Sequence, residues 1–273
     1  MQQHSVTVNG QTIAYYESPG RGRNLLLIHG NSASARSYAQ QVAGRLGHGH
    51  RIVAIDLPGH GSSSPAADPA ATYTLPGYAA IIVALAEHLG LQDAIFVGWS
   101  LGGNILLEAS NRLTAAAGIM ILGTAPVGIP PALNEAFLPH PAIAFNFQAD
   151  LRDEEIEAFA RSLFRPGFDA VPPSCLDDIR RTDGRARETL AASIQAGNYA
   201  DEVDVVARLT TPLAVVFGAQ EQLVNTQYPA GLTIPSLWRS QVQLIPDAGH
   251  AAHWEQHDAF NRLLEDFIRD TAA

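Results

Sequence analysis

A serine that lies between a buried strand and a helix carries the strongest chemical signal in the sequence. The apolar run Ala94–Val97 leads into Gly98-Trp99-Ser100-Leu101-Gly102, and helix-like apolar spacing begins after the serine. In this setting the Gly-x-Ser-x-Gly pattern is typical of a nucleophile elbow, a sharp turn that holds the serine hydroxyl clear of the sheet. The glycines allow backbone segments to approach closely on both sides of the turn. We therefore expect Ser100 to be a catalytic nucleophile.

A serine hydroxyl needs a general base within hydrogen-bond reach, and ten histidines are available. The best candidate is His250, because it follows the last expected strand on a loop that returns to the carboxyl edge of the sheet. Six of the other histidines lie in loops that they can brace, in a Gly-rich turn, or near the closing helix, where we expect solvated or structural roles. In that order they are His29 and His60, His48 and His50, and His253 and His257.

The base needs a carboxylate that fixes its tautomer and stabilises the imidazolium. Glu221 is the only acid in the loop that follows the apolar run Leu213–Phe217, although it could also be an exposed loop residue. Asp247 is the main rival, but it precedes His250 by only three residues and is better placed to support the loop. The order Ser100, Glu221, His250 is the order expected when the serine lies on a strand-to-helix elbow.

Two backbone amides are candidates for an oxyanion hole. The Leu101 amide lies at the start of the helix after the serine, where the local field favours negative charge. The second donor is expected from the loop after the strand Leu25–Ile28, which places the Asn31 amide beside that of Leu101.

The elements that must position these residues alternate between strands and helices. Val6–Tyr15 reads as a hairpin with an Asn9-Gly10 turn. Alternating strands and helices predict an α/β fold with a mostly parallel sheet covered on both faces. The expected core strands are Leu25–Ile28, Arg51–Ile55, Ala94–Val97, Gly118–Leu122, Leu213–Phe217 and Val242–Ile245, and the expected helices are Ser37–Leu46, Tyr78–Leu89 (capped by Gly90) and Phe260–Ile268.

The segment 126–205 interrupts this alternation. It has no strand signal and contains short helical stretches, among them Asp153–Phe164 and Asp177–Arg187. We expect a helical cap here, inserted into a core formed by residues 1–125 and 206–273, which excludes water and shapes the substrate pocket. Aromatic residues that could line this pocket, or could equally form the core of the cap, are Trp99 of the elbow and Phe145, Phe147, Phe159 and Phe164.

Composition excludes several classes of function. The net charge is −10 and no lysine is present, which excludes a Schiff-base or P-loop lysine and argues against a nucleic-acid partner. A lone cysteine, Cys175, gives neither an internal disulfide nor a metal-cysteine framework. No run is long enough to span a membrane and no signal peptide is recognisable. We expect a cytoplasmic enzyme for a small acyl substrate, with no cofactor, no metal, no membrane contact and no obligate protein partner.

Four motifs together resemble the α/β-hydrolase superfamily over the whole chain. They are Leu27–Ser32, Asp56–Ser63, Gly98–Gly103 and Ala248–His250. More narrowly, Gly98–Gly103, the segment Arg181–Arg187 and a glutamate at position 221 are similar to the metal-independent N-acyl-homoserine lactone lactonases of that fold. The resemblance implies hydrolysis of a quorum-sensing signal by Ser100, His250 and Glu221, with oxyanion donors from Asn31 and Leu101. The chain departs from the pattern at Phe159, where a polar tyrosine is expected near the lactone.

Other activities of such folds are narrowed by the residues present. Epoxide hydrolases and haloalkane dehalogenases use an aspartate where Ser100 stands, and the His/Asp motif of metal-dependent lactonases is absent from the sequence. A carboxylesterase remains open, as does a C–C bond hydrolase, whose substrate carboxylate Arg161 or Arg165 could bind. A signalling receptor that keeps the fold and the triad is the alternative from another class.

Overall fold

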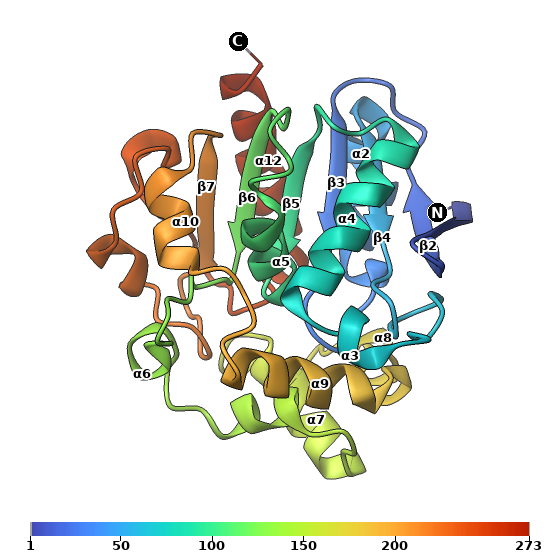
Figure 1. The fold of residues 1–273 in the computed structure, drawn as a ribbon. Helices are drawn as coiled ribbons and strands as arrows, with labels where there is room; N and C mark the ends of the chain where they lie inside the picture. The colour runs from blue at the N-terminus through green and yellow to red at the C-terminus, as the bar shows by residue number, and fades with distance from the viewer. Residues whose placement is uncertain (1, 273) are drawn as a thin grey trace.

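A single eight-stranded sheet forms the centre of the computed structural model, which describes residues 2–272. The strand order is β1-β2-β4-β3-β5-β6-β7-β8, and every pair beyond the first two is parallel (Figure 1). The predicted α/β-hydrolase architecture is confirmed. The strands are β1 (Gln2–Val8), β2 (Gln11–Glu17), β3 (Asn24–Ile28), β4 (Arg51–Ile55), β5 (Ile95–Trp99), β6 (Gly118–Leu122), β7 (Leu213–Gly218) and β8 (Gln243–Ile245).

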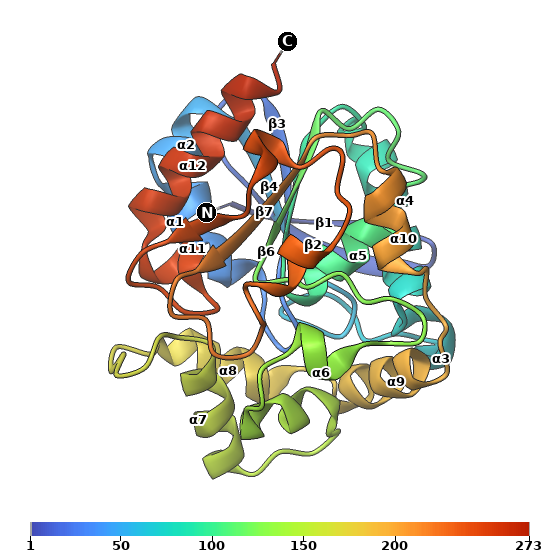
Figure 2. The same ribbon diagram turned by 90° about the vertical axis from the view of Figure 1, so that its left-hand side faces the viewer.

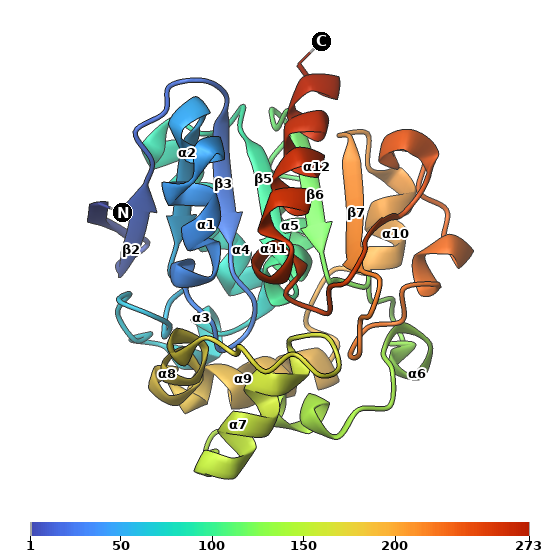
Figure 3. The same ribbon diagram turned by 180° about the vertical axis from the view of Figure 1, so that it is seen from behind.

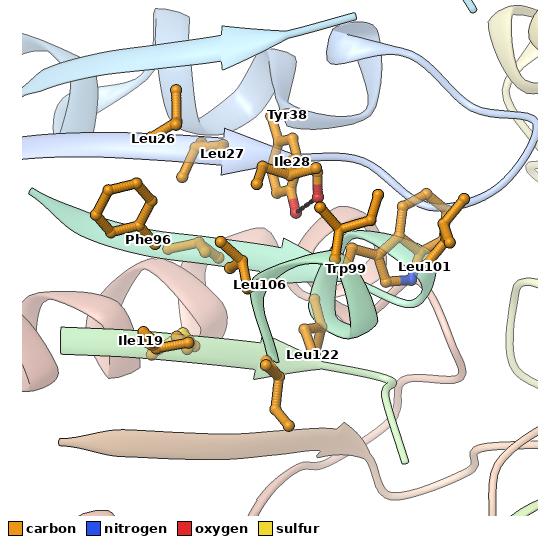
Figure 4. Close-up of a cluster of buried hydrophobic side chains, with 14 of the residues drawn as sticks. Leu26, Leu27, Ile28, Tyr38, Phe96, Trp99, Leu101, Leu106, Ile119 and Leu122 are labelled. Atoms are coloured by element: carbon orange, nitrogen blue, oxygen red, sulfur yellow. Dashed lines mark hydrogen bonds between the residues drawn. The ribbon is translucent and has the colours of Figure 1, made fainter. Parts of the chain in front are cut away.

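The central strands are buried on both faces, which explains their unbroken apolar sequences. All five residues of β5 and of β6 are buried, as are the last four of β3. Figure 4 shows side chains of these strands packed together, with the Tyr38 hydroxyl donating to the Ile28 carbonyl at 3.1 Å. The carboxyl ends of three neighbouring strands are therefore held rigidly relative to one another.

Helices cover both faces of the sheet. One face carries α4 (Leu75–Leu89), α5 (Leu101–Ala109) and α10 (Glu202–Arg208), as Figure 1 shows. The opposite face carries α1 (Ala39–Ala43), α2 (Arg45–Gly49), α11 (Ala252–Glu255) and α12 (His257–Asp270), which lie in front in Figure 3. The expected C-cap of α4 is confirmed, because Gly90 adopts a left-handed conformation with φ of 64°.

The single helix expected over Ser37–Leu46 is wrong. The chain instead forms η1 (Ala35–Tyr38), α1 and α2, with an extended residue, Gly44, between the last two. A Cβ at Gly44 would collide with the Gln40 carbonyl. Apolar spacing continues across this break, which is why periodicity alone did not reveal it.

Between β6 and β7 the described chain contains only helical elements, and those that precede α10 lie at the carboxyl ends of the strands (Figure 2). The expected helix Asp177–Arg187 is wrong in its bounds, since two helices meet at Thr182 and Asp183, where the Asp183 side chain caps the second. The elements are α6 (Leu133–Ala136), η2 (Pro141–Phe147), α7 (Asp153–Ser162), α8 (Pro173–Arg181), α9 (Gly184–Gln195) and α10, within which the expected boundary at residue 205 falls.

Polar contacts join these helices to the loops at the edge of the sheet. Asp183 accepts a hydrogen bond from the Tyr73 hydroxyl at 2.8 Å, and its amide donates to the Gly59 carbonyl at 2.9 Å. Arg36 forms ion pairs with Asp177, at 2.6 Å, and with Asp178. The contacts come from two loops of the core, so the segment is held at more than one point.

A second set of contacts, the clasp, joins the two ends of this helical segment. The Val127 amide donates to Glu202 Oε2 at 2.7 Å, and the Glu202 amide donates to the Val127 carbonyl at 3.0 Å. The Ile129 amide donates to Asp201 Oδ2 at 3.1 Å. The chain therefore leaves and rejoins the core at nearly the same place.

Within residues 2–272, no helix combines the length and apolar character needed to cross a lipid bilayer.

Candidate active site

Ser100 occupies a strained turn between β5 and α5. Its φ of 53° and ψ of −119° lie in a region that residues with a side chain rarely adopt. The turn is possible because Gly98 and Gly102 have no Cβ. A Cβ at Gly98 would collide with the Gly102 backbone, and a Cβ at Gly102 would collide with the Ile28 carbonyl. The geometry is that of a nucleophile elbow, with the hydroxyl at the carboxyl edge of the sheet.

His250 and Glu221 meet in the interior, as the sequence predicts. His250 Nδ1 lies 2.8 Å from Glu221 Oε2, and the two side chains are 3% and 0% exposed. The other carboxylate oxygen, Oε1, accepts from the backbone amides of Gln222 at 2.9 Å and Leu223 at 2.8 Å. Glu221 is thus fixed on both sides and is no exposed loop residue. The Glu221 carboxylate can hold the His250 ring by Nδ1, which leaves Nε2 of His250 free to accept a proton.

The loop that carries His250 is tied to the elbow. The Trp99 indole donates to the His250 carbonyl at 2.9 Å. Gly123 follows β6 with φ of 59°, and a Cβ there would approach the imidazole ring to 3.0 Å. Within residues 2–272 no hydrogen bond joins Ser100 to His250, although both side chains line the same pocket. Catalytic hydrogen bonds often tighten only when substrate binds.

His29 braces the loop that carries Asn31, rather than acting as a base. Burial lowers the pKa of His29 to about 4, so the ring is neutral near pH 7. A neutral imidazole has one donor and one acceptor, and here Nδ1 lies 2.7 Å from the Gly30 carbonyl while Nε2 accepts from the Leu57 amide at 3.0 Å. Gly30 leaves room for the elbow, since a Cβ would come within 3.2 Å of Ser100 Cβ.

The same loop is held by the helical segment above it. Asn31 Nδ2 donates to the Asn146 carbonyl at 3.0 Å. Arg187 Nη1 donates to Ser32 Oγ at 3.1 Å, and Ser32 has a φ of 56°. Within residues 2–272 the backbone amides of Asn31 and Leu101 have no hydrogen-bond acceptor, so both are free to bind an oxyanion.

These groups open into one pocket of about 720 Å³, open space at its mouth included. Its lining contains no Arg, Asp or Glu, and its walls are mostly apolar. Within the described residues, no group of three His, Cys, Asp or Glu side chains could hold a metal ion. The lining is Gly30, Asn31, Trp99, Ser100, Leu101, Asn104, Phe137, Ile143, Asn146, Phe147, Leu163, Leu190, Ile194, Leu223, Val224 and His250.

Of the aromatic residues suggested as lining, the structure brings Trp99 and Phe147 to this pocket. Phe159 is 1% exposed and lies in the interior of the helical segment, where it packs against the partly buried Phe145 with ring centroids 6.4 Å apart. Phe164 stacks on Phe168 beside a different cavity. Phe145, Phe159 and Phe164 therefore do not line the site, because helix packing turns them away from it.

Several lining residues were not identified from the sequence. Three had a usable signal: Asn104 comes four positions after Ser100, and Leu190 and Ile194 share one face of α9. Phe137 and Val224 had none, since an isolated bridge between distant loops brings them together.

The remaining charged candidates lie elsewhere. Asp247 is exposed and makes no contact with His250. Arg161 is exposed, and Arg165 lies 3.6 Å from the buried carboxylate of Glu255. Neither arginine lines the pocket.

Comparisons with known proteins identify the family and the fold. The model of the alpha/beta hydrolase family matches residues 25–263. Among solved structures, the N-acyl homoserine lactonase AidH complexed with N-butanoyl homoserine has a TM-score of 0.95 and 36% sequence identity, over 100% of this chain and 98% of that one. The same lactonase is solved as a serine-to-glycine mutant with N-hexanoyl homoserine lactone, and as a glutamate-to-glycine mutant with N-hexanoyl homoserine.

More distant relatives have other activities. A non-heme haloperoxidase of Rhodococcus erythropolis is 25% identical over 276 residues, covering 96% of this chain and 98% of the relative. A pimeloyl-(acyl-carrier protein) methyl ester esterase of Xylella fastidiosa is 27% identical over 263 residues, covering 93% and 98%.

Proposed function

Because the chain belongs to the alpha/beta hydrolase family, we propose that it is a serine hydrolase that opens the lactone ring of N-acyl-homoserine lactones. A fold by itself does not define a substrate. The observation that carries the proposal is the full-length likeness to a lactonase solved with acyl homoserine ligands.

The character of the pocket supports a neutral substrate with an apolar tail. Its walls combine aliphatic and aromatic side chains with the amides of Asn31, Asn104 and Asn146, and contain no Arg, Asp or Glu. A substrate carboxylate would have to be desolvated there without a cation to pair with. This argues against the C–C bond hydrolase of dienone acids.

In the proposed mechanism, His250 Nε2 takes the proton of the Ser100 hydroxyl as the serine oxygen attacks the lactone carbonyl carbon. The oxyanion of the tetrahedral intermediate accepts hydrogen bonds from the amides of Asn31 and Leu101, each worth on the order of 10²–10³ in rate. Glu221 holds His250 by Nδ1 and stabilises the imidazolium.

Collapse of the intermediate breaks the bond between the carbonyl carbon and the ring oxygen. His250 gives its proton to that oxygen, which becomes the hydroxyl of an open acyl-enzyme. A water molecule then gives a proton to His250 and attacks the acyl carbon. Release of Ser100 with its proton restored yields the N-acyl-homoserine.

The test is mass spectrometry of N-acyl-homoserine lactones of several chain lengths after incubation with the protein. The expected product is heavier than the lactone by one water and closes again on acidification. Ser100→Ala should lower kcat by about a million-fold, and Glu221→Gln by about 10⁴-fold because the amide presents the wrong partner to Nδ1.

Asp247→Asn is the matched acid control, and it should retain the wild-type rate. Free homoserine lactone as product would mean amide cleavage and would contradict ring opening. Rapid hydrolysis of p-nitrophenyl esters with every lactone left intact would point to a carboxylesterase, the activity that the esterase relative favours. No turnover of either class would favour a binding protein such as a signalling receptor.

A further inference from the structure

Asn104 presents an unused hydrogen-bond acceptor to the pocket. Its Nδ2 donates to the Ala125 carbonyl at 3.2 Å and to Glu202 Oε2 at 2.8 Å, which uses both hydrogens of the amide. The reverse orientation would set the amide oxygen against the Ala125 carbonyl, which can only accept. The side chain is therefore fixed with Oδ1 turned away from both partners.

Within residues 2–272 no group donates a hydrogen bond to this oxygen. The oxygen is not sealed inside the protein either, because it is absent from the set of fully buried polar atoms that lack a partner. Asn104 is half-buried and lines the pocket together with Ser100. Ser100 is the N-cap of α5 and Asn104 lies on its first turn, where the Asn104 amide donates to the Ser100 carbonyl at 3.3 Å.

Glu202 fixes the orientation of the Asn104 side chain by accepting a hydrogen bond from its Nδ2. The Glu202 side chain is completely buried, and burial raises its pKa to about 8. Its Oε2 accepts from both Asn104 and the Val127 amide, while Oε1 is sealed without a partner among the described residues. Burying a carboxyl group costs free energy unless hydrogen bonds compensate for the lost water. Here they orient Asn104.

We propose that Asn104 is a specificity-determining residue, whose Oδ1 accepts the amide N–H of an N-acyl-homoserine lactone, and that Glu202 is its positioning residue. The inference rests on the proposed function and identifies the amide N–H as the part of the substrate that Asn104 recognises. In these lactones the amide nitrogen is two bonds from the carbonyl carbon that Ser100 attacks, which fits an acceptor one helical turn from the nucleophile. An ester in place of the amide has no hydrogen to donate.

Asn146 is the natural comparison residue. It also lines the pocket, but its Nδ2 makes a single long bond, 3.4 Å to the Ile143 carbonyl. With one weak partner its amide is free to turn, so the orientation of its oxygen is not fixed.

The experiment compares N-hexanoyl-homoserine lactone with α-hexanoyloxy-γ-butyrolactone, which replaces the amide N–H by an ester oxygen. The readout is the ratio of kcat/KM for the two lactones, each corrected for its rate of alkaline ring opening. We expect the wild type to prefer the amide by about tenfold, the value of one well-made hydrogen bond in a pocket. In Asn104→Ala the ratio should fall close to one, and in Asn146→Ala it should persist.

Glu202 is tested by two substitutions. Glu202→Gln keeps an acceptor oxygen for Asn104 and should keep the preference, whereas Glu202→Leu should lose it. A residue with a merely structural role would alter the rates for both lactones together and leave the ratio unchanged. The melting temperature of each variant identifies those that fail to fold.

A wild type that opens both lactones equally overturns the inference without any variant and leaves ring opening by Ser100 intact. Loss of the preference in Asn146→Ala, or its persistence in Asn104→Ala, likewise overturns it. A wild type that opens neither lactone overturns the proposed function, and this assignment with it.

Discussion

His253 is a buried histidine that the proposed chemistry does not use. It is fully buried, and its ring lies 4.7 Å from that of Tyr38 and 4.8 Å from that of Trp99, centroid to centroid. Neither ring nitrogen has a protein partner within residues 2–272. Burial lowers the pKa of His253 to about 3. His253 therefore packs against the Trp99 ring, and both of its ring nitrogens are buried without hydrogen bonds.

This environment predicts how stability depends on pH. The folded protein leaves His253 neutral, whereas the unfolded chain binds a proton below about pH 6.5. The contribution of His253 to the free energy of unfolding is thus fully present above pH 6.5 and is lost as the pH falls toward 3.

His253→Phe should stabilise the protein by roughly 1–3 kcal/mol at pH 7, because two unpaired polar atoms are removed. His253 also borders a cavity of about 350 Å³, open space at its mouth included. Between pH 6 and 4, urea unfolding should show a pH slope smaller than that of wild type by about 1.4 kcal/mol per unit. His257→Phe is the exposed control and should keep the wild-type slope. Equal slopes for His253→Phe and wild type would show that the imidazole titrates freely in the folded state.

Residues with local signatures could be predicted, and residues defined by packing could not. Ser100 and His250 stand in short motifs at strand ends, and Glu221 was identified by its place after β7. The unused oxygen of Asn104 depends on Glu202, which is 98 positions away. His253 was expected to be solvated or structural, and only the structure shows the aromatic rings around it.

At the scale of elements, α9 positions the loop that carries the proposed oxyanion donor. Arg187, on α9, is 3% exposed and donates to the carbonyls of Gln148 and Ala149, both at 2.7 Å, and to Ser32 Oγ. The guanidinium thus joins three separate segments. Burial lowers its pKa, which still leaves it charged at neutral pH.

Arg187→Met should destabilise the protein by about 3 kcal/mol, because buried carbonyls lose charged donors. It should also lower kcat more than it raises KM, since the loop that bears Asn31 loses its support. The control is Arg185→Met on the same helix, because the exposed Arg185 guanidinium pairs with Asp183 in solvent, where an ion pair adds little stability. Urea unfolding and lactone kinetics measure both effects. An unchanged kcat in a folded Arg187→Met protein would contradict a role in the oxyanion loop.

Element type was easier to predict than element bounds. The strands were recognisable because buried parallel strands have continuous apolar sequences. The expected helices Ser37–Leu46 and Asp177–Arg187 were wrong because each is broken locally, by the extended and tightly packed Gly44 in one and by the side-chain cap of Asp183 in the other. Neither cause disturbs the apolar spacing.

At the scale of the whole molecule, the proposed triad joins three segments that are far apart in sequence and adjacent at one edge of the sheet. Ser100 follows β5, Glu221 follows β7 and His250 follows β8. The helices between β6 and β7 cover the same edge and contact two core loops (Figure 2). We therefore expect these helices and the sheet to unfold as one cooperative unit.

Two intrinsic probes can test this cooperativity. The only cysteine, Cys175, lies on α8, and burial raises the pKa of its thiol to about 12, so the folded protein should react slowly with thiol reagents. All three tryptophans lie on core elements: Trp99 on β5, Trp238 on η4 (Trp238–Ser240) and Trp254 on α11.

The urea midpoint for Cys175 labelling should coincide with the midpoint for tryptophan fluorescence. Labelling at much lower urea, with fluorescence unchanged, would mean that the helical segment separates from a folded core. Cys175→Ser provides the labelling background and should leave the fluorescence midpoint nearly unchanged.

The clasp at Val127 and Glu202 has a consequence for how such proteins can diversify. Because the helical segment starts and finishes at one place on the core, its length and sequence can change without altering the register of β6 and β7. At the level of the gene, the region between Ile129 and Asp201 is one contiguous insertion whose length can vary between its contacts with the core. The positions that make those contacts, Asp177, Asp183 and Arg187, are the ones least free to change.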